Sequence, residues 1–81
     1  MTLALSGRQL LRLLQKDGWS IGRRAKHGIT LTKSFGDYIK VTFVPDTRAS
    51  LPLGTLMAIL GAKQTGIGRK GFADLIDKYG I

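Results

Sequence analysis

The chain has 81 residues, enough for one small domain, and it contains no cysteine. A disulfide framework, a thiolate nucleophile and a cysteine-based zinc site are therefore excluded. Its 13 Lys and Arg residues outnumber five Asp residues, which gives a formal net charge of +8, and the bases concentrate between residues 8 and 40. This balance favours a polyanionic partner, nucleic acid first and an anionic membrane second. The alternative is a basic protein whose cations are only solvated.

A capping box, formed by Ser6 and Gln9, predicts the start of a first helix, and Gly18 predicts its end. One stripe of this helix is apolar, with Leu10, Leu11, Leu13 and Leu14. The opposite face is basic and carries Arg8, Arg12 and Lys16 at i, i+4 and i+8. These three cations either follow a nucleic-acid backbone or form a solvated face.

Three segments alternate as half-buried strands do: residues 19–23, 27–33 and 38–44. A turn over residues 34–37, with Gly36 free to adopt positive φ, predicts a hairpin between the second and third strands. In the third strand we expect Ile39, Val41 and Phe43 to face inward, and Tyr38, Lys40 and Thr42 to face outward. Trp19 is expected in the core, whereas Phe35 either contacts a base or a partner or folds back onto the sheet.

Pro45 ends the sheet, and a second helix is expected over residues 54–64, with Leu56, Ile59 and Leu60 toward the core. Gly61 weakens this helix and Gly66 closes it. A last helix is expected over residues 69–79. The prediction is one α+β domain over residues 1–81, with a core of about 6–67 and an additional C-terminal helix. Its order is α-β-β-β-α(-α), with a three-stranded antiparallel sheet and helices packed on one face.

His27 is the only histidine, and it follows Arg23, Arg24 and Lys26. An imidazole exchanges protons near neutral pH, so its place among cations fits metal-free phosphodiester cleavage. The alternative is an exposed strand-end histidine without a task. The five aspartates are scattered, which predicts no metal site, and no cofactor is expected.

Two further features argue against other functions. The segment 66–71 matches the dinucleotide pattern GxGxxG, but it follows a predicted helix and lacks the acidic residue about twenty positions on, so a helix–helix turn is expected. The N-terminal residues 1–5 have no basic region or long apolar stretch, and the longest apolar run elsewhere is 56–60. We therefore expect a cytoplasmic protein without membrane contact.

Several segments together resemble the HicA toxins. Residues 6–19 read SGRQLLRLLQKDGW and are similar to the family's opening helix and turn; residues 51–60 read LPLGTLMAIL and are similar to its LPPGTL helix start. Residues 64–67, QTGI, resemble the QAGI that ends that helix, displaced by an apparent two-residue insertion. His27 falls at the family's catalytic histidine, but Ala25 and Lys26 replace the glycine and small polar residue that precede it.

The resemblance implies a fold like a double-stranded RNA-binding domain. It also implies an mRNA-cleaving toxin of a type II toxin–antitoxin system, and a HicB-like antitoxin that covers the catalytic histidine. The first hypothesis is thus a metal-independent endoribonuclease (mRNA interferase) with His27 as its catalytic residue. The candidate RNA-binding residues are Arg8, Arg12, Lys16, Arg23, Arg24, Lys26 and Lys40.

The second proton-transfer role falls to a lysine, to Tyr38, to water or to nothing. The second hypothesis is a non-catalytic RNA-binding or regulatory module on the same fold, with its site altered by Ala25 and Lys26. A DNA-binding protein is a distant third, since no recognition-helix pattern stands out.

Overall fold

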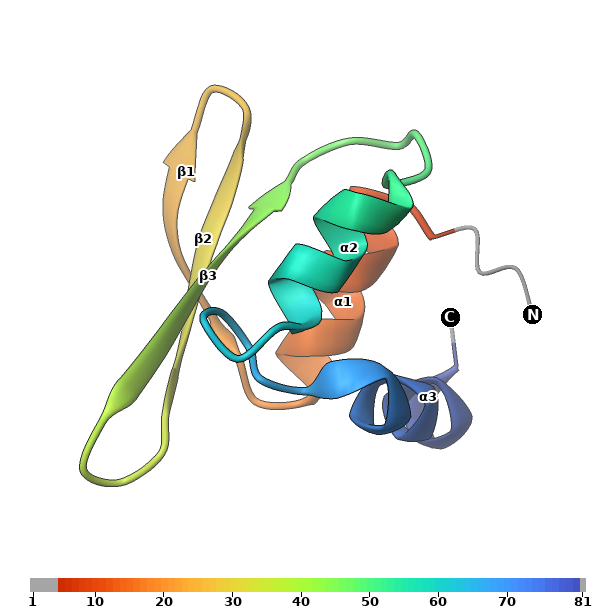
Figure 1. Ribbon diagram of the computed structural model, residues 1–81. Coiled ribbons are helices and arrows are strands. Elements are labelled where there is room, and N and C mark those ends of the chain that lie inside the picture. The colour runs from red at the N-terminus through yellow and green to blue at the C-terminus, as the bar shows by residue number, and fades with distance from the viewer. Residues whose placement is uncertain (1–4, 81) are drawn as a thin grey trace.

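The computed structural model describes residues 5–80, and the expectation about the N-terminal segment falls mainly on residues 1–4, outside this range. The elements follow the order α1 (Gly7–Lys16), β1 (Ser20–Ala25), β2 (Gly28–Ser34), β3 (Ile39–Pro45), α2 (Leu53–Leu60) and α3 (Gly68–Tyr79). The strands form one antiparallel sheet in the order β1-β2-β3. Helices α1 and α2 lie on the same side of the sheet, and α3 packs against both helices (Figure 1). The predicted α+β architecture is confirmed.

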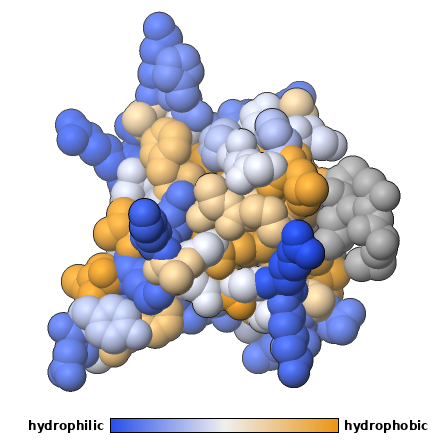
Figure 2. Space-filling model, in the orientation of Figure 1, coloured by the Kyte–Doolittle hydropathy of each residue, from blue (hydrophilic) through white to orange (hydrophobic). Residues whose placement is uncertain are grey.

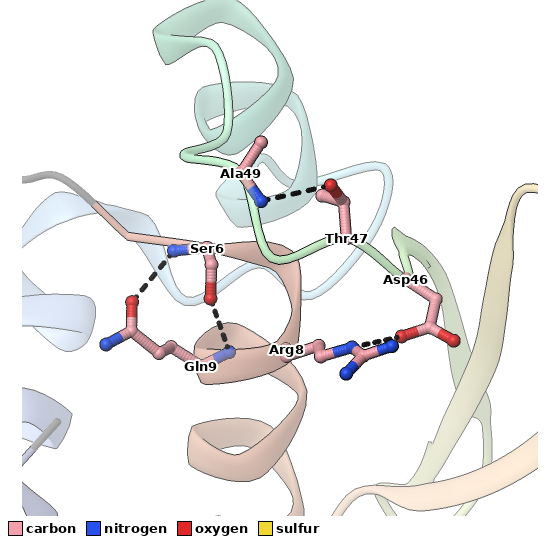
Figure 3. Close-up of polar contacts among 6 residues, drawn as sticks. All are labelled: Ser6, Arg8, Gln9, Asp46, Thr47 and Ala49. Atoms are coloured by element: carbon pink, nitrogen blue, oxygen red, sulfur yellow. Dashed lines mark hydrogen bonds and ion pairs between the residues drawn. The ribbon is translucent and has the colours of Figure 1, made fainter.

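Helix α1 begins with the predicted capping box. The Ser6 Oγ accepts from the Gln9 backbone N–H at 3.1 Å, and the Gln9 Oε1 accepts from the Ser6 N–H at 2.9 Å (Figure 3). Gly18 follows the helix with a φ of 97°, a conformation that favours glycine. The predicted apolar stripe is buried, with Leu10, Leu11, Leu13 and Leu14 all at most 6% exposed. The reciprocal cap and the buried stripe fix the orientation of the basic face of α1.

The prediction for the faces of β3 was wrong. Ile39, Val41 and Phe43 are 65%, 50% and 43% exposed, whereas Thr42 is 2% exposed and Val44 is fully buried. The register explains this, because Leu31 pairs with Thr42 and Ile29 with Val44, and these β2 residues face the helices. Alternation within β3 alone favours the wrong face, because Ile39, Val41 and Phe43 share one parity and only Val44 is apolar on the other. The buried Thr42 hydroxyl is satisfied by the Gln64 Oε1 at 2.6 Å.

Helix α2 is shorter than predicted. It ends at Leu60, and the Gly61 N–H donates to the Ala58 carbonyl at 3.2 Å, so Gly61 ends the helix instead of weakening it. The segment 66–71 contains the last two residues of the α2–α3 connection and the first turn of α3, with positive φ at Gly66 and Gly68. This geometry confirms the helix–helix turn that was expected in place of a dinucleotide site.

The core lies between α1, α2 and the covered face of the sheet. The predicted residues Leu56, Ile59, Leu60 and Phe72 are buried, and so is Trp19 at 3% exposure. Phe35 is 39% exposed and meets Trp19 edge-on, with ring centroids 6.3 Å apart, while Tyr38 stacks on it at 5.6 Å. Phe35 therefore folds back toward Trp19 and keeps part of its ring in solvent. Within residues 5–80, none of the helices has the length and apolar character that crossing a membrane requires.

Candidate nucleic-acid interface

His27 lies in the turn of the β1–β2 hairpin and not in the second strand, where the sequence placed it. Ala25 pairs with Gly28, so Lys26 and His27 are the two residues of the turn. Neither has positive φ, which the primed two-residue hairpin turns require. Both side chains are exposed, and within the described chain the structure gives His27 no hydrogen bond or ion pair. The imidazole is thus open to solvent at the tip of a hairpin.

Next to the turn, the β1–β2 hairpin is closely packed on the open face of the sheet. A Cβ placed on Gly28 would meet the Phe43 ring at 2.5 Å and the Val44 carbonyl oxygen at 2.6 Å. The Phe43 ring therefore lies against the Gly28 backbone, next to the turn. No sequence pattern indicates this requirement, because the contact depends on the register between β2 and β3.

Cations surround the turn. Arg23, Arg24 and Lys26 are all exposed, as is required of side chains that contact an anion. The β1–β2 register shifts between Ile21 and Arg24, so the segment that carries Arg23 bulges from the ladder. Figure 2 shows hydrophilic side chains projecting at the upper left, where the β1–β2 hairpin lies in Figure 1. This hairpin presents the imidazole within a cationic surface.

Lys40 does not belong to this group. Lys40 pairs with Lys33 of β2. It lies five positions along β3 from Pro45, and Pro45 pairs with Gly28, the residue after His27. At roughly 3.4 Å per residue, about 17 Å of strand separates Lys40 from the His27 end of the sheet. Its Nζ instead donates to the Ala62 carbonyl at 3.5 Å, beside the α2–α3 connection. Tyr38 lies at the same distant end, so neither Lys40 nor Tyr38 is placed to share in proton transfer with His27.

The basic face of α1 borders two hollows. The first, of about 400 Å³, is lined by Ser6, Arg8, Gln9, Arg12, Arg48 and Ser50. The second, of about 270 Å³, is lined by Arg8, Leu11, Arg12, Gln15, Ile21, Arg24, Ile29 and Asp46. Because Arg8 and Arg12 line both, the hollows adjoin along α1, and Arg24 connects the second hollow to the strand that leads into the His27 turn. Neither hollow is lined by Lys16 or by His27 itself.

Sequence reasoning missed Arg48. It stands alone in the polar connection between β3 and α2, with no periodic pattern that would mark it. Tertiary pairing brings it to α1, because Ser50 forms a β-bridge with Ser6 and the Leu51 N–H donates to the Leu5 carbonyl at 2.7 Å. A single arginine in a connection cannot be assigned to a binding surface from the sequence, because its neighbours are set by the tertiary structure.

One acid touches this surface. The Arg8 Nε lies 3.2 Å from the Asp46 Oδ1, and the two side chains are 47% and 37% exposed (Figure 3). Such an exposed pair contributes between zero and about 1 kcal/mol to stability. Its main effect is to orient Arg8 while its Nη groups stay available.

Across residues 5–80, no three His, Asp or Glu side chains come together as metal ligands would. Comparison of the chain with protein-family models, with curated proteins and with solved structures gave no significant match. The resemblance to the HicA toxins therefore rests on the sequence motifs alone.

Proposed function

We propose that the protein is an RNA-binding toxin of the HicA type, a metal-independent endoribonuclease that cleaves mRNA with His27 as its acid–base group. One observation supports this most directly. The solvent-exposed imidazole lies at the tip of a hairpin whose flanking residues are Arg23, Arg24 and Lys26. Arg8 and Arg12 of α1 line one hollow together with Arg24 of β1, so the cationic surface extends from α1 to the strand that leads into this turn.

In the proposed reaction the 2′-hydroxyl of the RNA attacks the adjacent phosphorus. His27 takes the proton from that hydroxyl, or gives one to the departing 5′-oxygen, which yields a 2′,3′-cyclic phosphate and a 5′-hydroxyl. Cations beside the phosphate stabilise the added negative charge, and Arg24 and Lys26 are the nearest candidates along the chain. With Tyr38 and Lys40 at the far end of the sheet, the second proton transfer falls to Lys26 or water. Slow cleavage is the expected consequence.

A non-catalytic RNA-binding module is the second candidate function. One observation favours it, since no hydrogen-bond partner among the described residues orients the His27 ring. General acid–base catalysis depends on a positioned group, and a free ring on a two-residue turn is poorly positioned before substrate binds. The replacement of the family's small residues by Ala25 and Lys26 adds to this alternative.

The proposal includes a HicB-like antitoxin as the protein partner and the cytoplasm as its location. A net charge of +8 would speed the encounter with an acidic protein as well as with RNA. An antitoxin that covers the β1–β2 hairpin would compete with RNA for the same cations. In this proposal the partner thus inhibits by occupying the cationic surface around His27.

The experiment is incubation of purified protein with an mRNA in the presence of EDTA, comparing wild type with His27→Ala and with Lys63→Ala. Lys63 is exposed in the α2–α3 connection, so its loss controls for a surface cation remote from the hairpin. Cleavage by wild type and Lys63→Ala is expected, with the rate of His27→Ala lower by roughly 10²–10⁴-fold. Catalysis by His27 would be ruled out if all three proteins cleaved the RNA equally, or if none of them cleaved it. Binding without cleavage would favour the second candidate.

A further inference from the structure

We propose that the first hollow, between α1 and the β3–α2 connection, binds a phosphate group of the RNA backbone, with Arg48 as a principal contact. The hollow is lined by three arginines and no acid: Arg8, Arg12 and Arg48. The inference rests on the proposed function for the source of the phosphate. It adds a binding site on α1 outside the β1–β2 hairpin and gives a role to a residue that the sequence did not single out.

The polar groups of this hollow are almost all donors. The Gln9 Oε1 accepts from the Ser6 N–H and the Ser6 Oγ accepts from the Gln9 N–H, so both acceptor oxygens are already engaged (Figure 3). The Ser6 hydroxyl proton and the Gln9 Nε2 remain as donors, beside the Ser50 hydroxyl and the guanidinium groups. A phosphodiester offers only acceptor oxygens and a negative charge, which matches such a lining.

The walls of the hollow are held by backbone contacts. The Arg8 N–H donates to the Thr47 carbonyl at 3.1 Å, and the Leu51 N–H donates to the Leu5 carbonyl at 2.7 Å. These bonds fasten both ends of the connection that carries Arg48 against the start of α1. Asp46 holds the Arg8 Nε at 3.2 Å and leaves its two Nη groups for a ligand. The backbone segments that carry Arg8 and Arg48 are therefore held side by side, and both side chains line the same hollow as Arg12.

The second hollow is less suited to a phosphate. It also contains three arginines, but Asp46 lies in its wall, together with the apolar side chains of Leu11, Ile21 and Ile29. A carboxylate repels a phosphate, and apolar walls offer it no hydrogen bond. The phosphate site is thus assigned to the first hollow, and the second connects it to the His27 hairpin.

The test compares Arg48→Ala with Arg69→Ala, using fluorescence anisotropy of a labelled RNA oligonucleotide over a range of salt concentrations. Both substitutions remove one exposed arginine, but Arg69 lies on α3, where its Nε contacts the Met57 Sδ at 3.4 Å. We expect Arg48→Ala to weaken binding by roughly tenfold and to lower the salt slope by about 0.7–0.9, the loss of one phosphate contact. Arg69→Ala should bind as wild type. Trp19 fluorescence during thermal unfolding verifies that both variants are folded.

A second arm separates this site from the proposed function. Inorganic phosphate is titrated into the wild-type protein while NMR follows the Nε–H signals of the arginines. Selective shifts of Arg8, Arg12 and Arg48 support the site even if the labelled RNA does not bind, and they would then indicate a free phosphate compound as ligand. If RNA binds and Arg48→Ala equals Arg69→Ala, the site is wrong while RNA binding stands. If neither RNA binding nor a selective shift is seen, both proposals fail.

Discussion

On the covered face of the sheet, Ile29, Leu31 and Val44 lie against α1 and α2 at no more than 3% exposure. On the open face, Ile39, Val41 and Phe43 are at least 43% exposed. These covered and exposed side chains are of similar hydrophobicity. On β3, Val44 of the covered face directly follows Phe43 of the open face. Figure 2 shows hydrophobic side chains in solvent at the left of the molecule, over the strands of Figure 1. On β3, therefore, apolar character does not identify the buried face, and the helices that cover the sheet do.

The comparison shows that burial, and not residue type, determines the energetic weight of a position in this sheet. A side chain on the covered face fills space between helices and strands, so removing atoms leaves a cavity. A side chain on the open face already contacts water and has few packed neighbours to lose. Substitutions on the two faces test this difference, and the free energy of unfolding is measured by urea denaturation followed by Trp19 fluorescence.

The largest expected effect is that of Leu31→Ala. Leu31 is fully buried in the middle of β2, so truncation should lower the free energy of unfolding by about 2–5 kcal/mol. Thr32→Ala is the control on the next residue, which pairs with Val41 on the open face, and it should lower stability by no more than about 1 kcal/mol. Equal losses at the two positions would contradict the assignment of the faces.

The same substitution on one strand gives a sharper comparison. Val44→Thr introduces a hydroxyl at a fully buried position and should destabilise by about 1–3 kcal/mol. Val41→Thr makes the identical change at a 50% exposed position and should stay within about 0.5 kcal/mol of wild type. The sequence-based prediction, with Val41 inward, expects the reverse order, so one pair of denaturation curves decides between the two orientations.

A smaller effect is expected for Thr42→Val. The Thr42 Oγ1 donates to the Gln64 Oε1 at 2.6 Å, and this bond joins the covered face of β3 to the α2–α3 connection. Valine keeps the shape but removes the donor, which should lower stability by about 1 kcal/mol. The Gln64 oxygen retains its 3.5 Å contact with the Phe43 N–H, which limits the loss. A variant more stable than wild type would show that the hydrogen bond contributes nothing.

A change in stability no larger than that of Thr42→Val is expected for Asp46→Ala, on the helix side of the molecule. Its exposed pair with Arg8 contributes between zero and about 1 kcal/mol. Removing this carboxylate from the wall of the second hollow should strengthen RNA binding, because a repulsive charge is lost. Asp77→Ala, an exposed acid on α3, is the matched control in the same anisotropy measurement. Weaker binding by Asp46→Ala would show that orienting Arg8 outweighs the repulsion.

Much of the fold was predictable from local signals. The capping box at Ser6, the leucine stripe of α1 and the order of the elements follow from rules that act within a few residues. The end of α2 was missed because a glycine at position 61 is compatible both with a weakened helix and with its end. Of the candidate site, the exposure of His27 and its neighbouring cations was predictable. The distance of Lys40 from His27 and the position of Arg48 beside α1 were not predictable, because both depend on long-range pairing.

The sequence by itself determined the order of the helices and strands, where α1 begins, and that a single imidazole stands among cations in the chain. These properties depend on side-chain chemistry and on spacing along a short stretch of chain. The tertiary structure alone decided which face of β3 is buried and which arginines share a hollow. The physical reason is that the alternation of β3 by itself favours the odd positions, Ile39, Val41 and Phe43, as the buried face. Only the pairing of Thr42 and Val44 with the buried residues of β2 makes one face the interior.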